Sequence, residues 1–472
     1  MALGALCTLA ACTVGPTFTP PPPATPAPQS FGAEPLDVKS STYAGAVDVA
    51  WWTRFKDPEL TSLVGRLARQ NLDLQIAAER VRQARSQRRI AAAQGLPQLD
   101  AHAQYTHERE SPAGLVSLTE PAPGAPLEFN LWQDSLSASW EIDLFGRVRR
   151  SVEAAGADIE AEVEARRSLA LAAISDLATD YLQLRDVQTR EGIARQDLQL
   201  ASENLALVRN RFDNGVATTL DTAQAAGQRA TIASMLPDLL SEEARLINAI
   251  GLLLAEPPRS LQAELSPPKA EPGAPPRVPV GLPGDLVRRR PDVREAEARL
   301  HSATAQTGVA VADFYPDITL MGDEGLQGLR LADAFSPRDR QFDIGPSISL
   351  PIFHGGRLRA TLQLRKSEQQ AAANDFQKTV LQAWRDVDDA LTAYAQAQRR
   401  QAQVDEALRQ DRIALAAARQ RYAEGAADFL NVIAAQSSLL NQQNTQATTN
   451  ADVSVRLVSL YKALGGGWEP FT

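Results

Sequence analysis

The sequence predicts a mainly α-helical protein with a smaller β portion, built as a tandem duplication of one unit of long helices and a β-hairpin. Three observations support this fold class. A ten-residue pattern returns in the second half, long segments rich in Ala, Leu, Gln and Arg carry apolar residues at helical spacing, and four short stretches alternate apolar and polar side chains.

The duplication is clearest in the pattern Arg-aromatic-x-x-Gly-x-Ala-x-x-Leu. It reads RFDNGVATTL at 211–220 and RYAEGAADFL at 421–430, an offset of 210 (421 minus 211). The same offset relates two apolar helix seams, Ile174, Leu177, Tyr181 and Leu184 in the first and Trp384, Val387, Leu391 and Tyr394 in the second. We therefore expect two repeats, at 51–255 and 285–465, and a C-terminal tail at 466–472.

A proline-rich linker is expected between the repeats, at 256–284, because proline is disfavoured in helix interiors. Each repeat is expected to contain a helix of moderate length, two strands, a very long helix and a final helix. The expected helices are 58–94, 147–214 and 217–254, then 284–313, 357–424 and 427–464. The longest would reach on the order of 100 Å, which is too long for one globular core.

The alternating stretches predict strands at about 97–107, 130–145, 316–324 and 341–353. In the second strand, one face carries Trp132, Leu136, Ala138, Trp140, Ile142 and Leu144, whereas the other face is polar. Leu350 and Ile352 are expected on the apolar face of the fourth strand. An ordinary soluble sheet alternates in the same way, but no other segment resembles a cover for these faces.

Lipid is a natural cover for the apolar strand faces, and the two tryptophans indicate its borders. Trp132 and Trp140 are eight residues apart, about 26 Å along a strand, which is comparable with an apolar band edged by aromatic girdles. Four strands cannot close a membrane β-barrel, and open edges in hydrocarbon leave backbone groups unpaired. Chains must therefore associate, and the strand count leaves a dimer and a trimer open.

Composition excludes several classes of function. The net charge of −9 and pI near 5.2 argue against a nucleic-acid partner. The only cysteines, Cys7 and Cys12, lie at the N-terminus, so the body has neither a disulfide framework nor a cysteine zinc site. The four histidines form no HExxH motif or close ligand pair, and no phosphate-binding loop is present. We expect a protein that is not an enzyme and has no metal or cofactor.

The N-terminus predicts a lipid anchor, since no run of about 18 apolar residues is present to form a membrane-spanning helix. Leu9-Ala-Ala-Cys12 has the pattern of a bacterial lipobox, in which Cys12 becomes the acylated N-terminus. Residues 1–11 would then be the signal peptide; they are short and lack Lys and Arg, which leaves the translation start open. Residues 12–50 would be a proline-rich tether. The alternative is a buried cysteine in a short apolar helix.

Several segments in order give the chain a resemblance to a known family. They are CTVGP from Cys12, WWTRFKDPELTSLV from Trp51, SASWEIDLFGRVR from Ser137, RRRPDVREAEARL from Arg288 and LPIFHGGRLR from Leu350, together with the two ten-residue motifs. With these the sequence resembles the TolC-like outer-membrane factors, and in particular the NodT-type efflux lipoproteins. The resemblance implies a homotrimer with a twelve-stranded β-barrel in the outer membrane of a Gram-negative bacterium, continued by a periplasmic α-barrel.

The resemblance also implies a function and its partners. The chain would passively conduct drugs or other small toxic compounds to the exterior, docked to a periplasmic adaptor and an inner-membrane pump of the RND type. A type I protein-secretion channel is an alternative within the same family. An alternative of another class is a periplasmic coiled-coil structural or adaptor protein.

The candidate gate lies at the two motifs. Gly215 and Gly425 follow long helical runs and can reverse the chain, which is also simple turn chemistry. The resemblance places Leu430 at an apolar constriction and makes Tyr422 and Asp221 the residues that link neighbouring helices in the closed state. Asn431 and Ala434 are uncharged where well-known members are acidic, so charge at the gate is expected from Asp221 of the first repeat.

Overall fold

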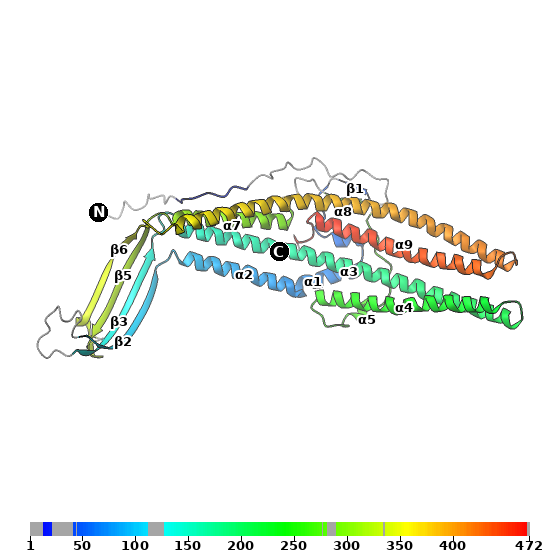
Figure 1. Cartoon of the computed structure of the whole chain (residues 1–472), viewed down its shortest axis with the longest axis horizontal. Helices are drawn as coiled ribbons and strands as arrows, with labels where there is room; N and C mark the ends of the chain where they lie inside the picture. The colour runs from blue at the N-terminus through cyan, green and yellow to red at the C-terminus, as the bar shows by residue number, and fades with distance from the viewer. Residues whose placement is uncertain are drawn as a thin grey trace. The chain divides into compact units, whose positions relative to one another are not determined.

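The computed structural model describes residues 13–20, 41–43, 45–111, 127–275, 277–280, 289–333 and 336–469. Figure 1 shows its helices and strands. Through the first repeat they are β1 (Ser41–Tyr43), η1 (Trp51–Phe55), α1 (Pro58–Gln70), α2 (Leu72–Ala93), β2 (Gln98–Arg109), β3 (Glu128–Glu141), α3 (Arg147–Asp213) and α4 (Thr219–Leu253). They continue with α5 (Gln262–Leu265), β4 (Arg277–Pro279), α7 (Pro291–Ala312), β5 (Asp317–Gly328), η4 (Pro337–Asp339), β6 (Arg340–Ser349), α8 (Arg357–Ala423) and α9 (Phe429–Ala463).

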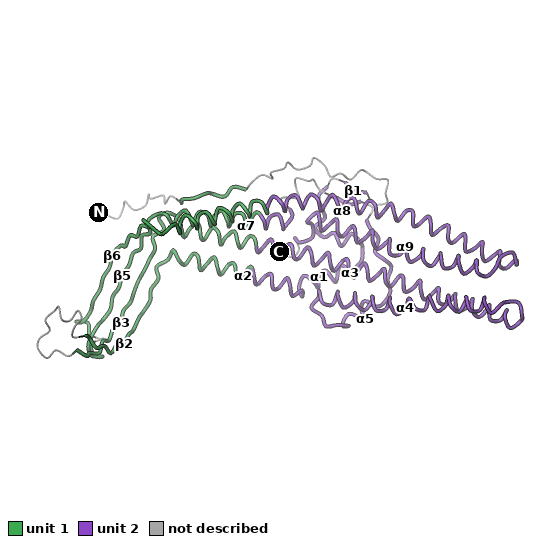
Figure 2. The backbone as a smooth tube through the Cα atoms, viewed as in Figure 1, with its two compact units in different colours: residues 1–21, 81–161, 297–375 green, residues 22–80, 162–296, 376–472 purple. Residues whose placement is uncertain are grey.

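The chain forms two compact units, and each unit draws on both repeats (Figure 2). Unit 1 contains 81–161 and 297–375 with the N-terminal segment up to residue 21, and unit 2 contains 22–80, 162–296 and 376–472. The two expected repeats, 51–255 and 285–465, are therefore not separate compact domains. The reason is that α2, α3 and α8 each contribute residues to both units.

Unit 1 contains a four-stranded antiparallel sheet in the order β2-β3-β5-β6. Residues directly opposite one another lie on the same face of a sheet. The register pairs Ala101 with Leu136, and Gly322 with both Ala138 and Ile344, so the expected apolar faces of the strands combine into one. Ile344 on this face is 75% exposed. The described chain therefore leaves the apolar face of the sheet uncovered.

The strand ends differ from the expected bounds. β3 ends at Glu141, so Ile142 and Leu144 follow the strand, although the Ile142 N–H still donates to the Ile318 carbonyl at 2.8 Å. β6 ends at Ser349, which leaves Leu350 and Ile352 outside the ladder. Proline at position 351 has no N–H to donate, so it cannot continue the ladder. β2 and β5 run two and four residues past their expected ends, to 109 and 328.

The helix expected at 58–94 is two helices. Asn71 lies between α1 and α2 with a non-helical backbone (φ −59°, ψ 123°), and its side-chain oxygen accepts a hydrogen bond from the Leu74 N–H at 2.9 Å. This side chain thus caps the start of α2. In the second repeat, α7 begins at Pro291, just after the irregular residue Arg290; residues 281–288, where the expected helix starts, lie outside the described residues.

Asn71 and Arg290 occupy equivalent positions in the two repeats, and each caps the end of the last helix of its repeat. In unit 2, the Asn71 side-chain amide donates to the carbonyl of Leu253, the last residue of α4, at 2.8 Å. The Arg290 guanidinium donates to the carbonyl of Ala463, the last residue of α9, at 3.1 Å. Both bonds satisfy carbonyls that have no partner within their own helix.

The linker expected at 256–284 has structure of its own. It contains the short helix α5 and strand β4, which pairs in parallel with β1 from the N-terminal region. A second long-range contact follows β1, where the Trp51 ring stacks on Tyr461 at 5.2 Å and its indole N–H donates to the Gly466 carbonyl at 3.0 Å. Within the described residues, no helix combines the length and the apolar character required to cross a membrane.

Candidate functional site

The first of the two tip turns joins α3 to α4 through Gly215. This glycine has a φ of 73°, which a residue with a side chain rarely adopts. Its N–H donates to the Phe212 carbonyl at 2.9 Å, and the Val216 N–H donates to the Arg211 carbonyl at 2.8 Å. These two bonds form a Schellman motif, which ends a helix and reverses the chain.

The second tip turn repeats this geometry between α8 and α9. Gly425 also has a φ of 73°. Its N–H donates to the Tyr422 carbonyl at 3.1 Å, and the Ala426 N–H donates to the Arg421 carbonyl at 2.8 Å. Neither glycine has an atom within 4 Å of the position that a Cβ would occupy. Backbone conformation, and not a close neighbour, is therefore the reason for glycine at both turns.

The helices that leave the two turns begin differently. Thr218 and Asp221 form a capping box at the start of α4, because each backbone N–H donates to the side chain of the other residue, at 2.8 and 3.2 Å. The Thr218 backbone N–H, and then its hydroxyl, hold the pKa of Asp221 below its usual value. At the start of α9, Asp428 makes no side-chain cap, and the side-chain amide of Asn431 reaches its carbonyl at only 3.5 Å.

The candidate gate residues lie in these turns but do not contact one another as a group. Leu430, the second residue of α9, is 54% exposed. Tyr422 is half-buried, with its ring 5.3 Å from Phe429 and beneath the Arg211 guanidinium at 4.7 Å. Asp221 bonds to Thr218, and the described chain has no bond between Asp221 and Tyr422. A link between these two residues remains a prediction for the assembled protein.

The two tip hairpins pack together through a small apolar cluster in unit 2. Leu205 and Val208 of α3 and Ala225 of α4 lie with Leu415, Phe429 and Val432 of α8 and α9. A polar bond lies next to the cluster, from the Asn204 side-chain amide to the Gln436 side-chain oxygen at 2.9 Å. The two helical hairpins of one chain thus form a single tip body.

The candidate girdle residues lie on the apolar face of β3. The Trp132 ring packs against that of Tyr105, its partner on β2, at 4.4 Å. The Trp140 indole N–H donates to the Gly95 carbonyl, just past the end of α2, at 3.0 Å. Trp140 therefore lies at the helical end of the sheet and Trp132 further along the strand. Their role as membrane girdles stays a prediction.

The segment that follows Cys12 is pinned to unit 1. Cys12 itself, the expected lipidation site, lies outside the described residues. The Val14 N–H donates to the Phe145 carbonyl at 3.1 Å, and the buried Arg150 side chain donates to the carbonyl of Val14 and the hydroxyl of Thr17 at 3.3 Å each. Residue 13 therefore lies close to the turn between β3 and α3.

Glycines permit this close approach. A Cβ on Gly15 would lie 2.6 Å from the Cα of Gly308 on α7, so the two backbones touch. Three residues later, the Phe18 ring stacks on His301 at 4.4 Å, and the His301 imidazole contacts the Glu153 carboxylate at 3.1 Å. The proline content of residues 12–50 predicts a tether, but these contacts do not follow from it, because the approach of Gly15 to Gly308 depends on tertiary structure.

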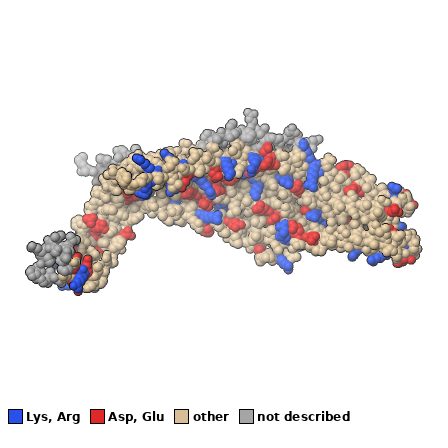
Figure 3. Space-filling model, in the orientation of Figure 1, with Lys and Arg blue, Asp and Glu red and all other residues tan. Residues whose placement is uncertain are grey.

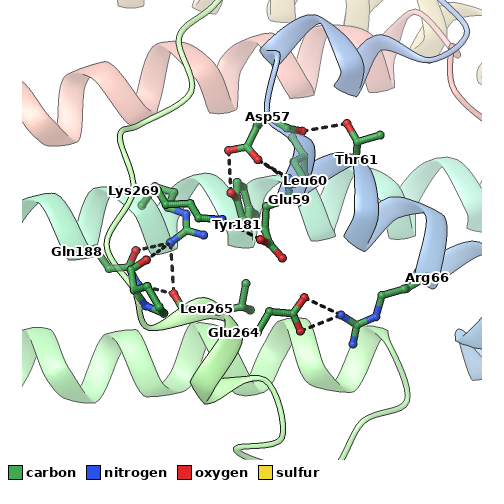
Figure 4. Close-up of polar contacts among 12 residues, drawn as sticks. Asp57, Glu59, Leu60, Thr61, Arg66, Tyr181, Gln188, Glu264, Leu265 and Lys269 are labelled. Atoms are coloured by element: carbon green, nitrogen blue, oxygen red, sulfur yellow. Dashed lines mark hydrogen bonds and ion pairs between the residues drawn. The ribbon is translucent and has the colours of Figure 1, made fainter.

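A polar network in unit 2 fixes the start of α1 against α3 (Figure 4). Asp57 caps α1 by accepting from the N–H groups of Glu59 and Leu60 at 2.8 and 3.0 Å. Its other oxygen accepts from the hydroxyl of Tyr181 on α3 at 2.7 Å. The pattern Asp-Pro at a helix start carries the signal for this cap in the sequence, whereas the spacing of the apolar residues alone does not predict it.

The same network holds the segment after α5 (Figure 4). Lys269 forms an ion pair with Glu59 at 2.8 Å, and Arg66 forms one with Glu264 at 2.9 Å. Gln188 on α3 donates to the Leu265 carbonyl at 2.7 Å. These contacts join the expected linker to the first repeat, so the segment after α5 packs against α1 and α3 and is held there by ion pairs and hydrogen bonds.

The described residues contain no group of three or more His, Cys, Asp or Glu side chains that could hold a metal ion. On the face shown in Figure 3, basic and acidic side chains intermingle over the helices. Glu271 is one of several carboxyls perturbed by their surroundings: burial, with the nearby Asp186 adding to it, raises the pKa of Glu271 to about 7. Glu271 lines a polar cavity of about 440 Å³ beside Gln398 and Asp405.

Comparison with known proteins gives consistent matches over nearly the whole chain. The model of the family described as outer membrane efflux protein matches residues 63–252 and 282–466. Nodulation protein T of Rhizobium leguminosarum bv. viciae is 34% identical, over 98% of this chain and 92% of that protein. The pyoverdine export outer membrane protein OpmQ of Pseudomonas putida is also 34% identical, over 94% of each chain.

A solved structure agrees with the sequence matches. The structure of the outer-membrane channel OprN has a TM-score of 0.87 and 33% identity, and the match covers 97% of this chain and 100% of that one. This chain and that channel thus share one fold over nearly their whole length. The chain belongs to the outer membrane efflux protein family.

Proposed function

We propose that this chain is the outer-membrane exit duct of a tripartite efflux system and passively conducts drugs or other small toxic compounds from the periplasm to the exterior. The observation that carries the proposal is the sheet of unit 1. Within the described residues its apolar face is uncovered, and its edge strands, β2 and β6, each lack a neighbour on one side. Lipid covers the face, and other copies of the chain pair with the edges.

A homotrimer is the assembly that we favour. Three copies of the four-stranded sheet supply twelve strands (three times four), which exceeds the minimum of about eight for a membrane barrel. The long helices line the periplasmic part of the duct. The chain performs no chemical step itself, and the energy for transport comes from an inner-membrane pump of the RND type, joined to the tip turns by a periplasmic adaptor.

Acylated Cys12 adds a second attachment to the outer membrane. Support comes from the lipobox Leu9-Ala-Ala-Cys12 and from the position of Val14, which bonds to Phe145 where β3 ends and α3 begins. A lipid on the residue before this segment lies near the helical border of the apolar sheet. We expect mass spectrometry to find acyl chains on Cys12 and to find none in Cys12→Ala, which should still assemble.

Localisation and assembly can be tested together. We expect the full chain to fractionate with the outer membrane and to migrate as a heat-modifiable trimer. Deletion of its gene in the source bacterium should increase accumulation of a fluorescent dye, and the wild-type gene should restore export. A chain found only in the periplasm, or normal dye export without it, would contradict the proposal and favour a periplasmic coiled-coil protein.

The gate assignment has a matched control within the chain. Leu430 and its repeat counterpart Leu220 are both exposed, at 54% and 64%. We expect Leu430→Ser to increase single-channel conductance in planar bilayers and Leu220→Ser to change it much less. Tyr422→Phe combined with Asp221→Ala should also increase conductance if these residues hold the tip shut. Equal effects of the two serine variants would show that Leu430 does not set the narrowest point.

A further inference from the structure

Each of the two ten-residue motifs begins with an arginine followed by an aromatic residue. Of the two possible arginine–aromatic stacks between the motifs, one is present in the described chain and the other is not. Arg211 of the first motif lies over the ring of Tyr422 of the second, with 4.7 Å between the guanidinium carbon and the ring centroid. Both residues are half-buried. The reciprocal pair consists of Phe212, next to Arg211, and Arg421, next to Tyr422.

The reciprocal residues are unused in the described chain. Phe212 is 43% exposed and Arg421 is also exposed. Within the described residues, neither the Phe212 ring nor the Arg421 guanidinium takes part in an ion pair or a ring contact. Their backbones are held in place, because the Phe212 and Arg421 carbonyls both accept Schellman bonds in the twin turns. The two side chains are thus displayed from fixed turns at equivalent positions.

Duplication supplies the geometric argument. Residues 211 and 421 occupy equivalent positions in two turns of the same backbone geometry. The α3–α4 hairpin contacts the α8–α9 hairpin of its own chain through Arg211. By the same geometry, the α8–α9 hairpin can contact a further α3–α4 hairpin through Arg421. One chain has only one α3–α4 hairpin, and its Arg211 is already stacked on Tyr422. An aromatic partner for Arg421 in the equivalent position, Phe212, must therefore come from another copy of the chain.

We infer that, in the homo-oligomer proposed above, the Arg421 guanidinium of one copy lies over the Phe212 ring of the next copy. A cation over an aromatic face is a favourable contact, and phenylalanine supplies the same face as Tyr422 without its hydroxyl. The intrachain and interchain stacks then alternate around the tips and close the ring. This inference rests on the proposed oligomeric duct and adds the residues that join its tips.

The neighbouring contacts explain why the two interfaces are similar without being identical. Within the chain, Asn204 and Gln436 form a hydrogen bond close to the Arg211–Tyr422 stack. The residues at the equivalent positions of the other repeat are Ala414 for Asn204 and Ala226 for Gln436. The interchain contact therefore lacks this polar bond and relies on small apolar side chains. Arg421 and Phe212 supply the directional contact that the alanines cannot make.

Cross-linking distinguishes the two stacks. We would place cysteines at 421 and 212 by Arg421→Cys and Phe212→Cys in the full chain, and treat membranes with a short bis-methanethiosulfonate reagent whose spacer matches an arginine side chain. We expect covalent dimers and trimers in a denaturing gel. The matched control, Arg211→Cys with Tyr422→Cys, should give an internally cross-linked monomer and no ladder. Each single-cysteine variant should give neither product.

The outcomes separate this inference from the proposed function. Native mass spectrometry of the same samples reports the oligomer without the reagent. An intact oligomer that gives no ladder from the 421 and 212 pair, while the 211 and 422 control is cross-linked, would overturn the inference and leave the duct standing. A wild-type chain that is monomeric in mild detergent would overturn both. As a second readout, Phe212→Leu should lower the heat-dissociation temperature of the oligomer, and Phe212→Tyr should preserve it.

Discussion

The two tip hairpins leave their helices in the same way and enter the next ones by different means. Gly215 and Gly425 have equal φ values and equivalent Schellman bonds. The first turn is then fixed by the hydrogen bonds of Thr218 and Asp221, whereas the second relies on Phe429, which is buried in the apolar cluster. Duplication has thus preserved the backbone of the turn and allowed its stabilising chemistry to diverge from hydrogen bonding to packing.

The middle of the two repeats shows the same divergence at another pair of positions. Asn71 and Arg290 both cap the end of a returning helix, but Arg290 is a buried cation. It also pairs with Asp292 at 2.7 Å and with Asp386 at 3.2 Å. The second repeat therefore depends on a charged network where the first uses one neutral amide.

The largest expected effect is the loss of this network. Arg290→Ala removes the ion-pair partner of Asp292, the side-chain donor to the Ala463 carbonyl and one of the two arginines that pair with Asp386, so we expect a loss of about 3 kcal/mol in the free energy of unfolding. Asn71→Ala should cost about 1 kcal/mol. Thermal unfolding in detergent measures both. Arg456→Ala, which removes an exposed pair with Asp452, is the control and should change stability little. Equal losses at 290 and 71 would contradict the comparison.

A second experiment tests whether packing holds the second turn. Phe429→Ala should remove about 3 kcal/mol of local stability, since it empties a buried aromatic site. Its repeat counterpart Thr219 is exposed, and Thr219→Ala should have almost no effect. Hydrogen exchange followed by mass spectrometry gives the protection of each turn separately. The idea fails if exchange around 425–432 is as slow in Phe429→Ala as in the wild type.

The glycines provide an experiment in which the two turns should agree. Gly215→Ala and Gly425→Ala place a side chain at positive φ with no other contact to disturb. Each should therefore destabilise its own turn by about 1 kcal/mol. Hydrogen exchange of the two turns measures the local effect. A large difference between the two variants would mean that the turns do not share one backbone conformation in solution.

Much of this comparison was predictable from the sequence, and the reasons are local. The offset of 210, the glycine after each long helix and the alternation in the strands all act over a few residues, so the twin turns and the apolar sheet face could be predicted. The spacing Thr218-x-x-Asp221 also predicts a capping box, a local signal beyond the turn and the gate that we expect from this motif.

The contacts that were missed join residues far apart in the chain. The cap that Arg290 places on Ala463, the pairing of β1 with β4 and the stacking of Trp51 on Tyr461 depend on how the long helices pack. A run of arginines at 288–290 predicts a surface when viewed alone, and burial of one of them follows only from tertiary structure. The strand ends predicted at 145 and 353 lie beyond the observed ends of β3 and β6, because the apolar–polar alternation continues after the hydrogen-bonded ladder stops.

The capping box offers the next experiment. Thr218→Ala removes the acceptor for the Asp221 N–H and should cost the first turn about 1 kcal/mol. Asp428→Ala should cost the second turn less, because Asp428 makes no side-chain cap. Hydrogen exchange of the segments 214–222 and 424–432 provides the measurement. A larger loss in the second turn would reverse the proposed difference.

The smallest expected effect is a dependence of the first turn on pH. The bonds from Thr218 lower the pKa of Asp221 in the folded protein, so the carboxylate contributes stability that is present above its usual pKa and is lost as the pH falls through the lowered value. Because Asp221 is only partly buried, solvent screening keeps the contribution below about 1 kcal/mol. After correction for intrinsic exchange rates, protection of the first turn should therefore decrease as the pH falls below about 5. Asp221→Asn should remove this dependence. If the first turn of the wild type responds to pH no more than that variant does, the carboxylate does not stabilise the turn, and the two hairpins differ only through the packing of Phe429.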